Sequence, residues 1–388
     1  MLDYLIFAAT VVVFLILAVI YLYPGSKKSI DIPGPEPVDP LEGNYPDIKA
    51  CGSLHEFLVD LHETYGPICS FWAGPQLCVS VASPELFSEQ ANSFNRPVEL
   101  FKAQTLLWGE NSPFVLNGAE GRKKHAFLTG IFNEKYASCS LKLEHEILKK
   151  QTASWLKWPN EQFFPLYEKI SGFVVKFLLS SHFGYDAENS KDVNVIKGNL
   201  DNVWQEVGHY MDDTSDADGL RDIRFEQYKK KLKSFISDAL ILRKTLPTVS
   251  DPAKLPIDHV LQLSEEEAVS ILLLLFTNAY MKYCSLFTWM GYFLALEPHV
   301  QDQVRKELGS IPIEEINLAN CNEFKYFKKV FQETLRCANI VSHTARIQNT
   351  DIVIQNSKIP ANLMTTLAKK IFYGMQIRTP IDLINFLT

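Results

Sequence analysis

The 388-residue sequence lacks the motifs of several large enzyme classes. It contains no Gly-x-x-x-x-Gly-Lys phosphate loop, no Gly-x-Gly-x-x-Gly fingerprint and no Gly-x-Ser-x-Gly nucleophile elbow. Its nine histidines include no His-x-x-x-His pair. The sequence therefore gives no support to a P-loop nucleotidase, a dinucleotide-dependent dehydrogenase, an α/β-type serine hydrolase or a helical zinc protease.

Paired cysteines and excess positive charge are missing as well. The seven cysteines are scattered, odd in number and free of any Cys-x-x-Cys, which argues against a disulfide scaffold and a zinc ribbon. No Asn-x-Ser/Thr sequon occurs, as expected of a chain kept out of the secretory lumen. The formal net charge of −7 predicts no general attraction to nucleic acid. Local basic runs at 122–124 and 229–231 are typical of solvated helix faces.

One long apolar run stands at the N-terminus. Residues 4–23 are 20 uncharged, mostly apolar positions, and at about 1.5 Å per residue such a helix spans roughly 30 Å, the hydrocarbon thickness of a bilayer. Lys27 and Lys28 follow it and Asp3 precedes it, so the positive-inside rule places the bulk of the chain in the cytosol. A cleaved signal peptide would have a basic start and a shorter core. We therefore predict an uncleaved transmembrane signal-anchor at 1–24.

Residues 25–41 are rich in proline, which fixes φ and cannot donate a backbone hydrogen bond, so they predict a stiff hinge. Beyond the hinge, apolar periodicity predicts a mainly α-helical domain with a small β-sheet. The predicted elements are a helix at 53–65 capped by Ser53 and Glu56, a hairpin around Gly74–Pro75, helices within 120–182 and at 225–244, 298–308 and 324–339, and short strands near 352–354 and 359–360.

Residues 264–296 form the longest predicted helix, and two interpretations of it remain open. The stretch is long and apolar enough to be a second transmembrane span. The same composition suits a helix that is buried on every side at the centre of a large domain. Thr277, Asn278 and Lys282 lie near its middle and would be costly in lipid, which favours the buried helix.

The order of several short motifs resembles the microsomal cytochrome P450 family. After the apolar run these motifs are IPGPEP, YGPICSFWAG, SPELFSEQANSFNRP, FLALEPHVQDQVRKEL, FQETLR and a final IP at 359–360. Each motif is weak alone, but their order and spacing together are specific. The N-terminal sequence, including GSLHEFLVDLHETYGP, is most similar to family 20, subfamily A. The resemblance implies a P450 domain over 42–360, followed by a divergent tail over 361–388.

The resemblance also implies a haem b cofactor and roles for individual residues. Glu333 and Arg336 match the Glu-x-x-Arg pair that holds the helical core against the haem-binding loop. Arg346 lies where the family places an arginine that contacts a haem propionate, although a solvated arginine at a strand edge is the alternative. Where the family has Trp-x-x-x-Arg for the other propionate, this chain has Gly121 and His125, which makes that contact a weak expectation.

Two features depart from the family pattern. Met281 and Lys282 occupy the positions of the acid and the alcohol that relay protons during oxygen activation. Methionine cannot relay a proton, and lysine with its usual pKa is a poor shuttle. Moreover, no cysteine lies in a complete Phe-x-x-Gly-x-x-x-Cys-x-Gly loop, because none has glycine two residues later. After Pro360 the sequence is no longer similar to the family.

The missing cysteine leads to three hypotheses. In the first, the chain is a truncated or alternatively spliced haem-thiolate monooxygenase that is inactive as given, does not bind haem stably and leaves the buried Glu333–Arg336 pair without its third partner. The second is a non-catalytic, membrane-anchored helical protein that binds lipid or protein partners. The third is a protein with two membrane spans.

Partners and location are implied by the resemblance as well. A complete family member would insert one oxygen atom from O2 into a lipophilic small molecule. Electrons would come from NADPH–cytochrome reductase, which would dock on a basic face with Arg122, Lys123 and Lys124. The expected location is the endoplasmic reticulum membrane, in contact with lipid through a single span, with the bulk of the chain in the cytosol.

Overall fold

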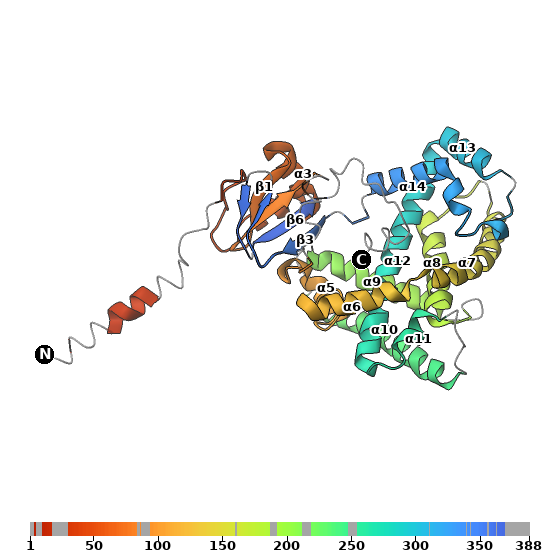
Figure 1. The fold of residues 1–388 in the computed structure, drawn as a ribbon, viewed down its shortest axis with the longest axis horizontal. Helices are drawn as coiled ribbons and strands as arrows, with labels where there is room; N and C mark the ends of the chain where they lie inside the picture. The colour runs from red at the N-terminus through yellow and green to blue at the C-terminus, as the bar shows by residue number, and fades with distance from the viewer. Residues whose placement is uncertain are drawn as a thin grey trace.

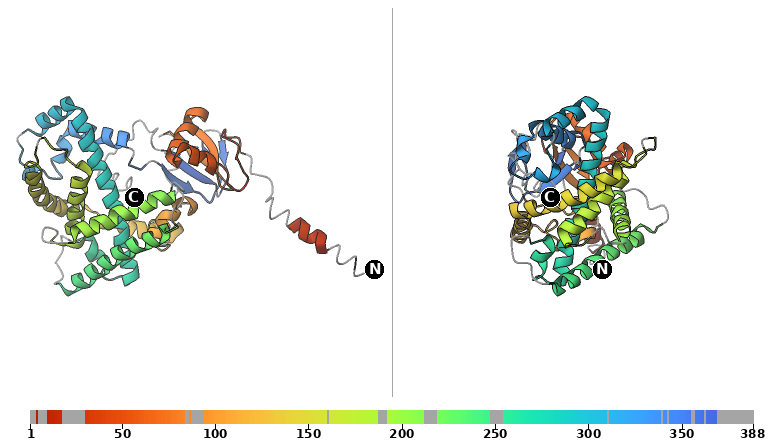
Figure 2. Two further views of the ribbon diagram at one scale, coloured as in Figure 1. Left: turned by 180° about the vertical axis from the view of Figure 1, so that it is seen from behind. Right: turned by 90° about the vertical axis from the view of Figure 1, so that its right-hand side faces the viewer.

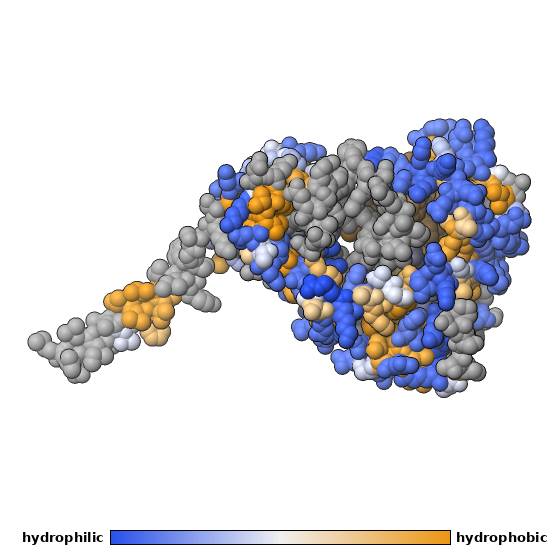
Figure 3. Space-filling view, in the orientation of Figure 1, coloured by the Kyte–Doolittle hydropathy of each residue, from blue (hydrophilic) through white to orange (hydrophobic). Residues whose placement is uncertain are grey.

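The computed structural model describes most of the chain beyond residue 30. The described residues are Tyr4, 10–17, 30–83, Leu86, 94–159, 161–186, 192–211, 219–246, 254–309, 311–338, 340–341, 343–354, 357–361 and 363–368. Of the predicted anchor, residues 10–17 are helical and exposed, and they form an apolar group in Figure 3. Apart from Tyr4, the rest of the anchor lies outside the described residues, as do the first part of the hinge and the tail after residue 368.

The fold is mainly α-helical, with a small sheet at one end and a large group of helices at the other (Figures 1 and 2). The helices are α2 (Tyr45–Cys51), α3 (Leu54–Tyr65), α5 (Lys102–Trp108), α6 (Gly118–Ile131), α7 (Glu134–Trp155), α8 (Leu166–Phe183), α9 (Val193–Met211), α10 (Arg221–Thr245), α11 (Pro256–Val260), α12 (Glu265–Leu296), α13 (Pro298–Leu308) and α14 (Lys325–Ala338), with 3-10 turns η1 (Glu99–Phe101), η2 (Ile313–Glu315) and η3 (Cys321–Glu323).

The start of α3 shows how local sequence sets an element. The Ser53 side chain accepts a hydrogen bond from the Glu56 backbone N–H at 3.2 Å, as the predicted cap requires. Phe57, Leu58 and Leu61 then fall on one face, where they are buried against the sheet. The helix predicted at 53–65 therefore forms, and its apolar face packs on the strands.

The sheet has four strands in the order β1–β2–β6–β3. The predicted hairpin is present as β1 (Ile68–Ala73) and β2 (Gln76–Val81), which pair antiparallel around Gly74 at φ +60°. β6 (Met364–Ala368) lies between β2 and β3 (His343–Ile347), parallel to the former and antiparallel to the latter. A separate hairpin joins β4 (Ile352–Ile354) to β5 (Ser357–Ile359).

Strand β6 corrects the predicted boundary of the domain. Its residues follow position 360 and so belong to the segment predicted to be a divergent tail. Met364 pairs with Cys78, Thr365 pairs with Arg346, and the buried Met364, Thr365 and Thr366 are fully enclosed. A strand with neighbours on both edges is integral to the sheet, so the fold continues at least to Ala368.

Helix α12 runs through the centre of the helical group and packs against α8, α10 and α14 (Figure 1). Within the described residues it is the one helix long and apolar enough to cross a membrane, and most of its apolar window is buried inside the fold. Thr277, Asn278 and Lys282 are buried with it. This burial favours the central-helix interpretation over a second span.

Candidate cofactor-binding site

Three chain segments meet beside the sheet and position a group of basic side chains. The end of β3 is joined to the 94–97 loop because the Ile347 N–H donates to the Asn95 carbonyl at 2.9 Å. The same loop is joined to the start of α6, since the Asn117 side chain accepts from the Arg96 N–H and donates to the Arg96 carbonyl, both at 2.8 Å. Residues distant in sequence are thereby fixed relative to one another.

The ring of Phe94 is the centre of this group. The guanidinium of Arg96 lies 5.9 Å from the ring centroid and that of Arg122 lies 5.7 Å from it. The His125 ring packs edge-to-face on Phe94, with centroids 5.9 Å apart. We call Arg96, His125 and Arg346 the basic cluster, because the charge of Arg346 acts on both Arg96 and His125 and lowers their pKa values.

Burial and mutual repulsion both act on the basic cluster. Burial, and secondarily the charge of Arg346, lower the pKa of Arg96 to about 9. The pKa of Arg346 is lowered by burial. Burial is also the largest cause that lowers the pKa of His125, followed by the charges of Arg96 and Arg346. His125 is therefore neutral at pH 7 in this arrangement, next to two cations.

No carboxylate in the described part of the chain forms an ion pair with Arg346 or His125. Arg346 instead donates to the Thr344 hydroxyl at 2.9 Å and to the Ala345 carbonyl at 2.8 Å. Arg96 donates to the Phe114 carbonyl at 3.1 Å and stacks over the Phe114 ring at 4.6 Å. Concentrated positive charge in a half-buried position is suited to binding an anion with carboxylate groups.

Gly121 explains why the family tryptophan is absent one turn before His125. A Cβ atom at position 121 would lie 2.1 Å from the Leu116 carbonyl oxygen and 3.0 Å from the Phe94 ring. No side chain fits there without moving the 109–117 loop. Helix α6 therefore approaches this loop closely, and His125 is the member of the basic cluster that α6 contributes.

The predicted proton-relay positions lie on α12, where Lys282 is buried and Met281 is half-buried. One carboxylate that contacts α12 is Asp201 of α9, which accepts a hydrogen bond from the Tyr280 hydroxyl. Tyr167 of α8 donates to the same carboxylate at 2.9 Å. At about 100° per residue, Tyr280 and Lys282 point roughly 200° apart, so Asp201 does not supply the missing acid at the relay positions.

The Glu333–Arg336 pair forms as the spacing predicts. Arg336 Nε and Nη2 donate to the two carboxylate oxygens of Glu333 at 2.7 and 2.6 Å. However, the Glu333 side chain is 60% exposed and that of Arg336 is 35% exposed. The expectation of a buried pair is therefore wrong for the described fold, because the pair lies on the outer face of α14.

The free cysteines are the candidates for an axial ligand of haem iron among the described residues. Burial raises the pKa of the Cys69 and Cys284 thiols to about 12, so both stay protonated at neutral pH. Cys337 is exposed beside the Glu333–Arg336 pair, and burial and Glu333 raise its pKa. No group of three potential metal ligands occurs in the described part of the chain. The basic cluster thus fits the carboxylates of haem, whereas neither Cys69 nor Cys284 is a thiolate at neutral pH.

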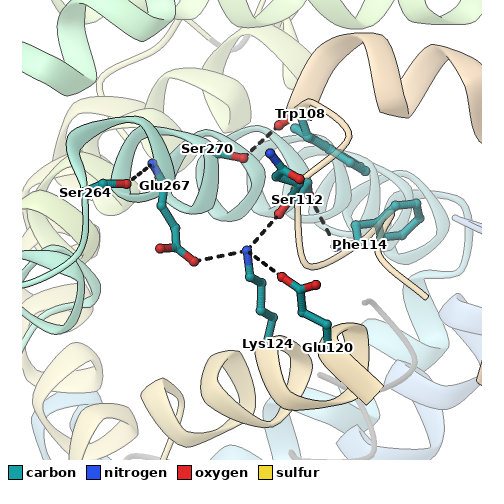
Figure 4. A network of polar contacts seen from close by, with 9 residues as sticks. Trp108, Ser112, Phe114, Glu120, Lys124, Ser264, Glu267 and Ser270 are labelled. Atoms are coloured by element: carbon teal, nitrogen blue, oxygen red, sulfur yellow. Dashed lines mark hydrogen bonds and ion pairs between the residues drawn. The ribbon is translucent and has the colours of Figure 1, made fainter. Parts of the chain in front are cut away.

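The basic face predicted on α6 is smaller than expected. Lys124 points toward the start of α12, where its Nζ lies 3.1 Å from Glu267 and 3.3 Å from the Asn111 carbonyl (Figure 4). Arg122 is exposed but rests on Phe94. Lys123 is therefore the member of the run that points into solvent without such a contact in the described structure. The three cations are therefore not equivalent, which corrects the prediction of one basic face formed by all three.

The fold defines a domain of the cytochrome P450 type, and comparison with known proteins agrees. The cytochrome P450 family model matches residues 33–368, and the chain belongs to this family. It is 31% identical over 379 residues to cytochrome P450 20A1 of Bos taurus, covering 95% of this chain and 79% of that protein. The Homo sapiens protein of the same name is 29% identical over 381 residues, with the same coverage.

The solved structures agree with the fold. Retinoic acid bound cyanobacterial CYP120A1 superposes with a TM-score of 0.73 at 16% identity, covering 88% of this chain and 78% of that chain. The predicted family, its similarity to family 20 and the mainly α fold with a small sheet are therefore confirmed. Family membership implies haem and a haem-thiolate monooxygenase activity.

Arg96 is the site residue that sequence reasoning missed. It lies in the motif FNRP, which reads as a loop and gives no periodic signal. The cue that could have identified it is an arginine before proline, in a segment already assigned to the family. Its burial and its position between Phe94 and Phe114 are tertiary properties that no local pattern contains.

Proposed function

We propose that this chain is the scaffold of a membrane-bound haem monooxygenase, in which Arg96, His125 and Arg346 hold the carboxylates of haem b. The observation that carries the proposal is the basic cluster, where the buried Arg96, the half-buried Arg346 and an imidazole converge beside the sheet. Guanidinium groups bind carboxylates through parallel, charge-assisted hydrogen bonds. Anchoring both propionates would orient the macrocycle between the sheet and α12.

Haem b held by a thiolate supplies the oxygen chemistry of the family, in which one atom of O2 enters a lipophilic substrate. Arg96, His125 and Arg346 would bind the propionates through their positively charged or hydrogen-bonding groups. None of the seven cysteines lies in the family loop. We therefore propose that the 388-residue chain binds haem weakly and does not form the thiolate complex.

Two measurements test these statements. Haem titration of the detergent-solubilised chain should show weaker binding for Arg346→Ala, whereas Arg305→Ala, an exposed control on α13, should bind as the wild type does. The reduced carbon monoxide difference spectrum should lack the far-red Soret band of the family. If that band were present, a cysteine would ligate iron, and Cys337→Ser and Cys284→Ser would identify which one.

A non-catalytic, membrane-anchored protein that binds lipid or protein partners is the second candidate function. The lack of a cysteine loop favours it, because the fold would persist without the chemistry. Equal haem binding by wild type and Arg346→Ala would support this candidate over the first. In both cases we expect the endoplasmic reticulum membrane as the location, and in the first NADPH–cytochrome reductase as the partner, reached through Lys123 and Arg122.

A further inference from the structure

We propose that Tyr136, Glu144 and Tyr283 form a binding site for an organic cation, an ammonium or guanidinium group on an apolar body. The site lies where α7, α8 and α12 meet, and it contains no residue of the basic cluster. The inference does not depend on haem binding, because it concerns a separate group of acidic and aromatic side chains.

Glu144 of α7 is the acidic member of this group. Its half-buried carboxyl has no hydrogen-bond or ion-pair partner among the described residues. Burial is the one cause that shifts its pKa, so no described cation acts on it. In such surroundings little water competes for the charge, and a bound cation therefore gains more from this carboxylate than from one in open solvent.

Tyr283 of α12 supplies an aromatic ring next to this carboxyl. Its ring stacks on Phe287 with centroids 5.9 Å apart and lies 6.3 Å from the Phe177 ring of α8. Burial and, second, the charge of Glu144 raise the pKa of Tyr283 to about 12, which places the carboxyl and the phenol close together. A cation between a carboxylate and an aromatic ring is attracted by both.

Tyr136 lies on α7 about two turns before Glu144 and borders the site on the side of α8. Burial, and then the charges of Tyr283 and Glu144, raise its pKa. Its ring packs edge-to-face on His182 at 6.4 Å, and its hydroxyl lies 3.5 Å from His182 Nδ1. The Nε2 atom of His182 is buried and has no hydrogen-bond partner. Glu144 and His182 thus leave two polar groups unsatisfied in one place.

The sign of the pH dependence follows from the groups that surround Glu144. Tyr136 of α7, His182 of α8 and Tyr283 of α12 are all uncharged at neutral pH, His182 because burial lowers its pKa to about 3. Without a ligand, burial raises the pKa of Glu144 to about 7. A bound cation favours the carboxylate and lowers that pKa, so the complex binds fewer protons than the free protein. Affinity must therefore increase as the pH rises through about 7.

The probe for the test is phenethylammonium, whose alkylammonium group keeps its proton at both pH values used. Its binding to the full-length chain in detergent micelles is followed by saturation-transfer NMR at about pH 6 and about pH 8. We expect roughly tenfold tighter binding at about pH 8, because the ionised fraction of a group with a pKa of about 7 rises about tenfold over this interval. 2-Phenylethanol, the neutral analogue, should bind weakly and equally at both.

Substitutions separate the charge of Glu144 from the apolar surroundings. Glu144→Gln keeps the shape and suits a half-buried position, so the variant should fold, bind the probe at least about tenfold more weakly at about pH 8 and lose the pH dependence. Glu146→Gln, at an exposed neighbour, should bind as the wild type does. Tyr283→Phe keeps the ring and should bind within about twofold of the wild type, whereas Tyr283→Leu should bind severalfold more weakly.

The same cationic chemistry has a second source within the chain. Lys369, Lys370 and Arg378 follow the last described strand. A full-length chain with all three replaced by glutamine separates the two sources. Tighter binding of phenethylammonium by this triple variant than by the wild type would assign the site to a side chain of that segment. Equal binding would assign it to a free organic cation.

Two results would overturn the inference. If neither the wild type nor the triple variant binds phenethylammonium, there is no cation site at Glu144. If Glu144→Gln binds the probe as tightly as the wild type and with the same pH dependence, the probe lies elsewhere and the carboxyl has a structural role alone.

Discussion

Burial alone sets the charge state of Glu144 on α7. This carboxyl has no hydrogen-bond partner among the described residues, and burial raises its pKa from 4.5 to about 7. Tyr136 and Tyr283 are its described titratable neighbours, and their pKa values are raised by burial in turn. The folded chain thus holds a proton on Glu144 that the unfolded chain releases at lower pH.

Stability should therefore decrease as the pH rises from about 4.5 to about 7. The group favours folding fully below the unfolded pKa, and ionisation in the folded state removes that contribution. We expect Glu144→Gln to raise the free energy of unfolding at about pH 8 by roughly 1–3 kcal/mol, since one pKa unit corresponds to about 1.4 kcal/mol and partial exposure reduces it. Urea unfolding at several pH values measures this. Glu146→Gln, an exposed neighbour, is the control, and an unchanged pH profile in Glu144→Gln would contradict the assignment.

Single residues also show what sequence can and cannot identify. Glu333 and Arg336 are recognisable from their spacing, because i to i+3 contact is a property of any helix. Their exposure is not recognisable, since it depends on which elements cover α14. Arg346 and His125 are found by resemblance, whereas Arg96 emerges only when tertiary contacts place it beside them.

At the scale of elements, two indoles tie α12 to the helices around it. Trp108 of α5 donates from Nε1 to the Thr277 hydroxyl at 2.9 Å, and Trp204 of α9 donates to the Thr277 carbonyl at 2.8 Å. Ser270 donates to the Trp108 carbonyl at 2.8 Å (Figure 4). These contacts fix α5 and α9 on the turn of α12 that precedes the predicted relay positions.

Replacing Trp108 should therefore destabilise the helical group. Trp108→Phe removes the hydrogen bond to Thr277 and part of a fully packed side chain, with an expected loss of roughly 1–3 kcal/mol. Trp289→Phe, at a position 43% exposed on α12, should change stability by less than about 0.5 kcal/mol. Chemical denaturation of both variants measures the difference. Equal losses would show that the Trp108 contact is not stabilising.

Strand β6 gives a sharper test of where the domain ends. A chain that stops after residue 360 loses the strand between β2 and β3 and leaves two unpaired edges, which promotes aggregation. A chain that stops after residue 368 keeps all four strands. We expect the shorter chain to be insoluble or unfolded and the longer one to retain the circular dichroism spectrum of the full chain. Met364→Ala in the full chain should cost roughly 2–5 kcal/mol, because Met364 is completely buried.

Most elements were predictable because their signals are local. The cap at Ser53, the Gly74–Pro75 turn and the apolar stripes of the long helices fix element type within a few residues. β6 was not predictable in the same way, because a five-residue strand has little periodicity of its own. Its assignment depends on pairing with β2 and β3, which are distant in sequence.

At the scale of the whole molecule, the fold separates two models of membrane attachment. A second span would remove α12 from the contacts with α8, α10 and α14 that bury it. It would also place Lys282 and Asn278, which are buried in the fold, within lipid. The apolar run 4–23 faces no such conflict, because residues 10–17 are exposed. We therefore propose a single span at 4–23, with the following domain in the cytosol.

We expect alkaline carbonate to leave the full chain in the microsomal pellet, because residues 4–23 are long enough to span the hydrocarbon core. A chain without residues 1–24 should move to the supernatant, which attributes attachment to this run rather than to α12. Protease added to intact microsomes should then degrade everything after about residue 30, since the positive-inside rule predicts that Lys27 and Lys28 keep the following domain in the cytosol. Protection of a fragment that begins near residue 300 would instead require α12 to cross the membrane, and the buried position of Lys282 would have to be abandoned with the single-span topology.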